Sequence, residues 1–298
     1  MTTTWLLRPE GGGELALRTI RRVAMLFGRG AARAILYPVA AYFVFRRAPE
    51  RRASRAFLSC VPGRRATLAE VFRHFLCFAT VTLDRVFLLS DRFRRFDVRC
   101  YGLDELHRAI DLGRGVLLFG AHFGSFDALR VLSLQREDLT FRVVIDLDQN
   151  PTVSRLLSSL NPDLATTVIN ARQAGPTVAL AIHDALATGG LVTLLVDRAR
   201  PGNRVLQAEF FGQRAGFPTA AWEMAAALHA PVVLCFGIYR GRNRYDLHFE
   251  LSAEEVTCDR RNREAEISER IREFAERLEE YVRKAPYNWF NFYDFWAS

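Results

Sequence analysis

The strongest constraint on the fold is an alternation of short apolar runs with helical patterns, which begins at about residue 95. Eight runs rich in β-forming residues are predicted to be strands, at 95–101, 115–119, 141–147, 166–169, 191–196, 206–211, 231–239 and 245–251. Patterns with helical spacing separate several of them, at 124–136, 151–160, 175–187 and 218–229. Strands that alternate with helices form a parallel sheet covered on both faces. We therefore predict the α/β class, with a largely parallel mixed sheet flanked by helices.

The first 90 residues have a different pattern, which is helical throughout. In residues 66–89 apolar side chains recur every three or four positions, which predicts a long and strongly apolar helix. Another amphipathic helix is predicted near the end of the chain, at 261–284. No repeat and no low-complexity linker divides the sequence. We therefore expect a helical, arginine-rich region at 1–90 that packs, as part of one structural unit, on an α/β body at 91–298.

One part of the helical region is apolar enough to interact with a membrane. Residues 23–45 are apolar apart from Arg29 and Arg33. The uninterrupted part, residues 34–45, would form about 18 Å of helix, whereas the hydrocarbon core of a bilayer is about 30 Å thick. Pro38 also stands within it. The stretch is therefore short for a transmembrane span.

The charges around this stretch favour the membrane interface as its environment. The two arginines within it are four residues apart and share a helical face, and two more arginines follow at 46 and 47. We expect a helix in the plane of the interface, with its arginines toward the headgroups and three aromatic side chains in the apolar layer: Phe27, Tyr42 and Phe43. A helix that covers the globular core is the alternative.

Basic charge is concentrated at the beginning of the chain. The first hundred residues contain nineteen arginines and seven acidic residues, and the whole chain has a formal net charge of +8. This distribution predicts an anionic partner, such as a membrane surface or an acidic carrier protein. A nucleic-acid binder needs arginines interleaved with exposed aromatic residues. Because the basic cluster borders the most apolar stretch instead, we do not expect nucleic acid as a partner.

The five cysteines are widely spaced, and no two of them form a C-x-x-C pair. Such spacings predict reduced thiols in a reducing compartment and offer no metal site. The amino terminus lacks the basic start and apolar run of a cleavable signal peptide. We therefore expect no cleavable signal peptide.

His122 lies at the corner between a predicted buried strand and a predicted helix, where α/β folds tend to place chemistry. In "GAHFGSFD", Asp127 follows it by five positions and glycines flank it on both sides. An aspartate early in that helix could accept a hydrogen bond from one ring nitrogen and leave the other nitrogen free as a base. Such a pair deprotonates a bound hydroxyl without a serine or cysteine nucleophile. The alternative is structural, because aspartate is favoured early in helices by the helix dipole.

Four blocks of the sequence resemble the late lipid A biosynthesis acyltransferases (lauroyl and myristoyl transferases), which belong to the glycerolipid-type acyltransferases. These blocks are "GAHFGSFD", "LVTLLVDRARPGN" (191–203), "AEFFGQRAGFPTAAWEMAAALHAPVV" (208–233) and "APYNWFNFYDFW" (285–296). The resemblance covers roughly residues 20–296, and H-x4-D and F-F-G are its most specific elements. The aromatic end differs from the basic segment common in lipid A enzymes and resembles relatives found with aryl-polyene pigment synthesis.

The resemblance implies that His122 is the general base and that Asp127 orients it. It also implies six residues that bind substrate: Gly124, Ser125, Arg198, Glu209, Phe211 and Gly212. Backbone amides at the start of the helix would stabilise the oxyanion, and Arg198 would bind a phosphate of the acceptor or the donor. Two alternatives stay open: Arg198 could pair with Asp197 or another acid, and Glu209 could be a solvated carboxylate at a strand end.

The resemblance further implies a membrane-associated O-acyltransferase, peripheral or monotopic, on the cytoplasmic face of a bacterial inner membrane. It would move a fatty acyl group from acyl carrier protein or coenzyme A to a hydroxyl of a lipid or glycolipid. Because the thioester is already activated, we expect no metal or prosthetic group. The expected partners are the lipid acceptor, the anionic membrane surface and acyl carrier protein. A catalytically silent lipid-binding or scaffold protein with the same fold is the alternative.

Overall fold

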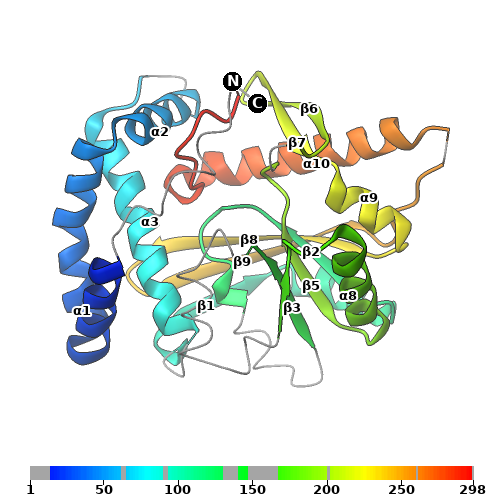
Figure 1. Ribbon diagram of the computed structural model, residues 1–298, viewed down its shortest axis with the longest axis horizontal. Coiled ribbons are helices and arrows are strands. Elements are labelled where there is room, and N and C mark those ends of the chain that lie inside the picture. Colours follow the sequence, from blue (N-terminus) through cyan, green and yellow to red (C-terminus); the bar gives the residue numbers. More distant parts are fainter. Residues whose placement is uncertain are drawn as a thin grey trace.

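A computed structural model describes residues 14–61, 65–89, 93–129, 140–146, 167–199, 202–259 and 261–296, with the backbone alone for 14–25. The predicted helix 151–160 and residues 130–136 of the predicted helix 124–136 lie outside the described residues. The described part contains a central sheet, helices on both of its faces and a group of three helices beside it (Figure 1).

Seven strands form one mixed sheet in the order β1-β9-β8-β2-β5-β3-β4. Their bounds are β1 Asp97–Tyr101, β2 Val116–Gly120, β3 Phe141–Ile145, β4 Val168–Asn170, β5 Leu191–Leu195, β8 Val232–Gly241 and β9 Arg244–Ala253. Neighbouring strands from β8 to β4 run parallel, whereas β9 is antiparallel to β8 and parallel to β1. The prediction of a largely parallel mixed sheet is confirmed.

The predicted run at 206–211 forms one strand of a separate antiparallel hairpin, β6 (Val205–Phe210) and β7 (Gln213–Pro218). Strand β7 does not appear among the predicted runs. Its first two residues are polar and exposed, and a proline ends it, so it lacks the apolar pattern by which the other strands are found.

Seven α-helices and three short 3₁₀ helices lie within the described residues. The α-helices are α1 Glu14–Arg46, α2 Ala48–Cys60, α3 Leu68–Leu88, α4 Leu103–Asp111, α8 Gly175–Ala187, α9 Ala220–Ala227 and α10 Arg263–Lys284. The 3₁₀ helices are η1 Phe93–Arg95, η2 Asp127–Leu129 and η3 Pro286–Asn288. Helices α3, α8, α9 and α10 confirm predictions, whereas the short α4 was not predicted.

Both faces of the sheet are covered, and the side chains of β2 alternate between them. Leu117 and Phe119 pack in one buried cluster with side chains of α8, α9 and α10. Val116 and Leu118 pack in a second cluster with side chains of α3 and α4. All four β2 side chains are fully buried, so this strand is the centre of the core.

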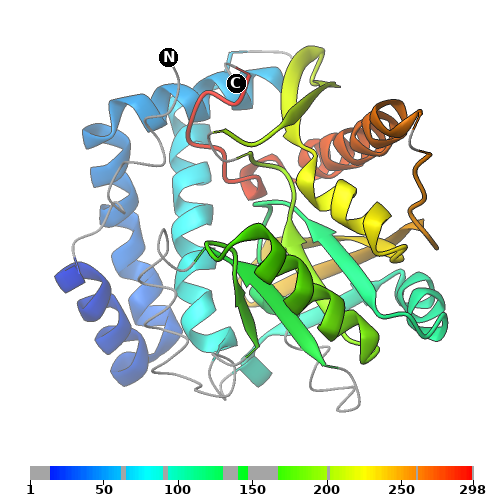
Figure 2. The ribbon, with the colours of Figure 1, turned by 45° about the vertical axis from the view of Figure 1, so that its right-hand side comes forward.

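Helices α1, α2 and α3 form a group at one side of the sheet, blue to cyan in Figures 1 and 2. Helix α3 begins at a capping box, in which Thr67 and Glu70 satisfy each other's backbone amides. Its buried side chains bond to the α/β body: Asp84 accepts from the Tyr245 hydroxyl at 2.7 Å, and the ring of His74 bonds to the Trp289 carbonyl at 2.9 Å. The helical region therefore packs directly on the body.

The orientation of α1 corrects the prediction for Arg29, which was expected to face lipid headgroups. Arg29 turns toward the protein and forms two hydrogen bonds with the carboxylate of Asp84, at 2.6 and 2.7 Å. The Asp84 side chain is fully buried, so its charge needs a cation as partner. The free energy gained by this ion pair outweighs the loss of solvation of Arg29. Phe43, which was expected in lipid, is partly buried against the core.

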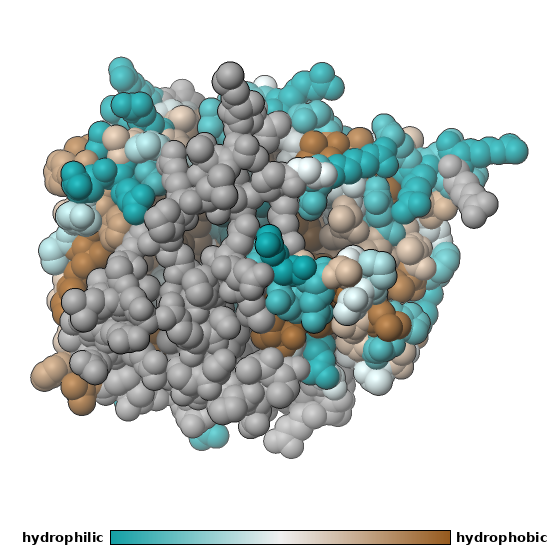
Figure 3. All heavy atoms as spheres, in the orientation of Figure 1, coloured by the Kyte–Doolittle hydropathy of each residue, from teal (hydrophilic) through white to brown (hydrophobic). Residues whose placement is uncertain are grey.

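Exposed apolar side chains lie on both parts of α1, which a kink at Gly28 divides. Phe27 and Tyr42, two of the three aromatic residues predicted to face lipid, are 72% and 58% exposed. Leu26, Tyr37 and Phe45 are exposed on the same helix. In Figure 3 apolar residues lie along the edge of the molecule that α1 forms, on the left. Within the described part of the chain, no helix combines the length and apolar character needed to cross a bilayer.

Candidate active site

Two neighbouring strands bring His122 and Asp197 together. Strands β2 and β5 are parallel and their last residues, Gly120 and Leu195, are paired. His122 and Asp197 each lie two residues beyond this pair, at the carboxyl edge of the sheet, where α/β proteins place their ligands. Nδ1 of His122 lies 2.7 Å from Oδ1 of Asp197. The sheet register thus joins two residues that are 75 positions apart in the sequence.

Asp197 is completely buried and has partners on both carboxylate oxygens. The indole Nε1 of Trp289 donates to Oδ2 at 3.2 Å, and Nε of Arg198 lies 3.7 Å from the same oxygen. Burial alone raises the pKa of Asp197, but the charge and hydrogen bond of His122 and the charge of Arg198 outweigh this effect and lower the pKa to about 2. The carboxylate is therefore ionised at neutral pH.

The surroundings of His122 keep its ring neutral. Partial burial and the positive charge of Arg198 lower the pKa of His122, and the opposing effect of Asp197 does not reverse this shift. An ionised carboxylate can only accept a hydrogen bond, which assigns the ring proton to Nδ1 and a lone pair to Nε2. The side chain is 38% exposed, and no described residue forms a hydrogen bond with Nε2. A neutral imidazole with a free Nε2 can act as a general base.

Asp127 does not form the predicted hydrogen bond to His122. Its Oδ2 accepts from Nε of Arg85, on α3, at 2.8 Å. Two causes explain the difference. The chain after His122 continues as the 3₁₀ helix η2, which begins at Asp127, and the permanent charge of Arg85 is a stronger partner for a carboxylate than a neutral imidazole.

Gly124 and Ser125 hold the loop of His122 against the 3₁₀ helix η3 and strand β8. The amide of Gly124 donates to the Asn288 carbonyl at 2.7 Å, and the amide of Ser125 donates to the Gly237 carbonyl at 2.9 Å. A Cβ on Gly124 would lie 1.6 Å from the Gly237 oxygen, and the φ angle of Gly124 is 59°. Both amides are thus bonded within the protein, so these two are not free to bind an oxyanion. The glycine is needed for a close approach to β8.

Arg198 forms the ion pair that the sequence left open as an alternative. Besides approaching Asp197, its Nη2 donates to the Phe290 carbonyl at 2.5 Å, and its guanidinium lies 5.3 Å from the centre of the Tyr293 ring. Its side chain is 13% exposed. The residue therefore contributes positive charge beside His122 from within the protein.

The F-F-G element is the turn of the β6–β7 hairpin. Phe211 and Gly212 both have positive φ angles, 54° and 72°, as a two-residue hairpin turn requires. The amide of Phe211 donates to the carboxylate of Glu279, on α10. Glu209 is exposed opposite Arg214, and no hydrogen bond joins it to His122 or Asp197. None of the three predicted hairpin residues forms a hydrogen bond with the His122 ring.

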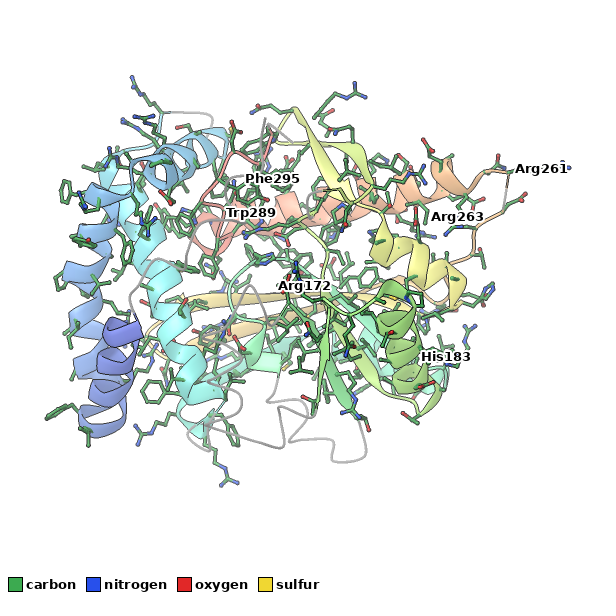
Figure 4. All side chains as sticks on the ribbon, viewed as in Figure 1. Arg172, His183, Arg261, Arg263, Trp289 and Phe295 are labelled. Carbon is green, nitrogen blue, oxygen red and sulfur yellow. The ribbon has the colours of Figure 1, made fainter. Side chains whose placement is uncertain are left out.

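The C-terminal segment contributes groups that the sequence analysis did not assign to the site. Trp289 and Phe295 lie together beside α10 (Figure 4), with ring centres 4.9 Å apart. Phe210, of the hairpin, packs edge-on against Trp289 at 5.1 Å. The Phe290 amide donates to the His122 carbonyl at 2.8 Å. The aromatic tail therefore closes the core directly behind the site, which is the commonest role of aromatic residues.

The structure also shows which signal identifies the missed partner of His122. "GAH" and "LVD" each follow a buried apolar run, and the two runs form adjacent parallel strands. His122 and Asp197 each stand two residues after the end of their strand, so the parallel register of the two strands places them side by side. Among the described residues, no three His, Cys, Asp or Glu side chains are placed to hold a metal ion.

Comparison with known proteins identifies the family of the chain. A search of curated proteins finds no match. The family model for bacterial lipid A biosynthesis acyltransferase matches residues 15–298, a range that includes the helical region, the whole sheet and the C-terminal segment. The chain therefore belongs to the bacterial lipid A biosynthesis acyltransferases.

Proposed function

We propose that this acyltransferase moves a fatty acyl group from a thioester to a hydroxyl of a lipid or glycolipid, with His122 as general base and Asp197 as the carboxylate that orients it. The donor is acyl carrier protein or coenzyme A. The observation that carries the proposal is the 2.7 Å pair of His122 and a buried, ionised Asp197, with Nε2 unoccupied among the described residues. The family membership supports the type of reaction.

The proposed reaction proceeds in two steps. Nε2 of His122 takes the proton of the acceptor hydroxyl while its oxygen attacks the carbonyl carbon of the thioester. The tetrahedral intermediate then collapses, the carbon–sulfur bond breaks, and the thiolate takes the proton from the imidazolium and leaves as a thiol. Asp197 holds the Nδ1–H and stabilises the imidazolium that forms between the steps, as in other histidine–carboxylate pairs.

The surface of α1 supports a peripheral location at a membrane, proposed here as the cytoplasmic face of a bacterial inner membrane. Its exposed side carries Phe27, Tyr42 and Phe45, and the exposed Arg46 ends the helix. Aromatic side chains next to arginine suit the boundary between acyl chains and anionic headgroups. The arginine-rich region would also attract an acidic carrier protein.

An acyl-transfer assay with labelled acyl carrier protein and bacterial membranes tests the proposal. We expect His122→Ala to lower the rate about 10²-fold or more, the usual effect of losing a general base. His183→Ala is a matched control, because His183 also pairs with an aspartate, at 3.2 Å, but is exposed on α8 (Figure 4). Full activity of His122→Ala would remove His122 from this role. Lipid binding without transfer by the wild type would identify a silent lipid-binding protein.

The same assay identifies the carboxylate that serves His122. We expect Asp197→Asn to lower kcat far more than Asp127→Asn, because only Asp197 bonds to the ring. The opposite ranking would show that Asp127 leaves Arg85 and takes over His122 when substrate binds.

A further inference from the structure

A line of buried hydrogen bonds connects the helical region to Asp197. It begins at Ser54 on α2, whose Oγ lies 2.8 Å from Nδ1 of His74 on α3. Nε2 of His74 lies 2.9 Å from the Trp289 carbonyl oxygen, and the indole of Trp289 donates to Asp197 at 3.2 Å. All four side chains are fully buried. Within the described residues this is a continuous path from α2 to the carboxylate of His122.

Each link in this path has a fixed direction. Burial lowers the pKa of His74 to about 3, against the opposing effect of its bond to the Trp289 carbonyl, so its ring is neutral. A carbonyl can only accept, which assigns the ring proton to Nε2 and leaves Nδ1 to accept from the Ser54 hydroxyl. His74 thus holds the backbone of Trp289, and the Trp289 indole holds Asp197.

The backbone around Trp289 is tied to the same site from both sides. Asn288 accepts from the Gly124 amide, and the Phe290 amide donates to the His122 carbonyl. The indole ring itself packs edge-on between Phe57 of α2, at 4.9 Å, and Phe210. Neither the indole nor its N–H can therefore move independently of the loop that carries His122.

We propose that Trp289 is a positioning residue for acyl transfer, held in place by His74. A carboxylate bonded through one oxygen can rotate about its terminal torsion, whereas a second donor on the other oxygen fixes its plane. The indole N–H is that second donor, and it keeps Oδ1 of Asp197 directed at Nδ1 of His122. This inference rests on the proposed role of His122 and Asp197.

Trp289→Phe tests the inference, because it removes the N–H and retains most of the ring. We expect kcat to fall about tenfold, as for the loss of one hydrogen bond to a charged group, with KM for the acyl donor unchanged. Trp222→Phe is the matched control: Trp222 is equally buried and packs edge-on against Phe119 at 4.9 Å, but it does not bond to Asp197. It should lower the melting temperature and leave kcat unchanged.

A double-mutant cycle separates positioning from general destabilisation. In an Asp197→Asn background, Trp289→Phe should cause little further loss of kcat, because its effect passes through the carboxylate. His74→Phe, which retains the ring stacked on Phe292 at 4.5 Å but removes the donor, should show the same pattern with a smaller loss. His74→Phe also provides the test if Trp289→Phe does not fold.

Three results would overturn the inference: an unchanged kcat in both Trp289→Phe and His74→Phe, an equal loss in the Asp197→Asn background, or a rise in KM alone. These results would leave the proposed function intact, provided that His122→Ala is inactive in the same assay. Full activity of His122→Ala would instead contradict the proposed function.

Discussion

Two completely buried aspartates, one in the helical region and one at the edge of the sheet, are held in different ways. Asp84 accepts two hydrogen bonds from Arg29 and one from the Tyr245 hydroxyl. Its pKa is raised, because burial outweighs these partners. Asp197 has an imidazole, an indole and a more distant guanidinium as partners, and its pKa is about 2.

The difference lies in where the hydrogen bonds end. Every partner of Asp84 named above belongs to the packing between α1, α3 and β9, so this carboxylate joins three elements. Asp197 bonds to a histidine whose side chain is 38% exposed, so its charge acts on a group that can meet a substrate. Of these two buried carboxylates, only Asp197 bonds to an imidazole, a group that can exchange a proton with a substrate near neutral pH, which makes it the candidate for a functional site.

The same substitution at both positions should give opposite phenotypes, and this is the largest effect we expect. Asp197→Asn should lower kcat about 10²-fold or more, because the amide no longer stabilises the imidazolium. Asp84→Asn should lower the free energy of unfolding by about 3 kcal/mol, because it leaves the Arg29 guanidinium without an anionic partner, and should leave kcat of the folded protein unchanged. Urea unfolding and initial rates on the two variants measure both effects. If the fully folded Asp84→Asn variant also lost kcat, the two aspartates would not differ in function as proposed.

The surface of the helical region offers a second contrast with the sheet edge. We expect a triple variant, Phe27→Ser, Tyr42→Ser and Phe45→Ser, to bind vesicles that contain anionic lipid about 10²-fold more weakly, because it loses three apolar side chains from the interface. Its kcat on detergent-dispersed substrate should not change. Leu180→Ser is the control, since Leu180 is 61% exposed on α8. Equal binding of both variants to vesicles would show that α1 is not the membrane-binding surface.

Most of the architecture could be predicted because it depends on local patterns. The boundaries of α8 match the prediction at both ends, and α3 differs from it by two residues at its start and one at its end. Periodicity did not show which side of α1 faces the protein. The signal for that orientation was Asp84, an acid inside the most apolar predicted helix, which must find a cation once it is buried.

The candidate site was predictable in one half only. His122 stands out because of its motif and its position after a buried strand. Its partner depends on the order of the strands, and β2 and β5 are neighbours although β3 and β4 lie between them in sequence. Trp289 depends on still more distant packing, because the C-terminal segment returns to the loop of His122. Sequence patterns describe the elements, whereas these contacts arise only when the elements assemble.

The smallest effect we expect is a shift in the pH dependence of acyl transfer. It tests how the charges at the edge of the sheet set the pKa of His122. The rate should rise with pH as His122 loses its proton and then level off, with its midpoint below the pH at which an unperturbed histidine titrates, because the pKa of His122 is lowered. The positive charge of Arg198 lowers the pKa of His122, and that of Arg85 acts in the same direction more weakly. Removing a positive charge favours the protonated ring and therefore raises this pKa. Arg198→Met should thus move the acidic limb of kcat/KM to higher pH, and Arg85→Met should move it less. Two results would contradict this expectation: a shift to lower pH in Arg198→Met, or a larger shift in Arg85→Met than in Arg198→Met. Either would mean that the acidic limb reports the titration of another group, and that the imidazole beside Asp197 is not the base of the reaction.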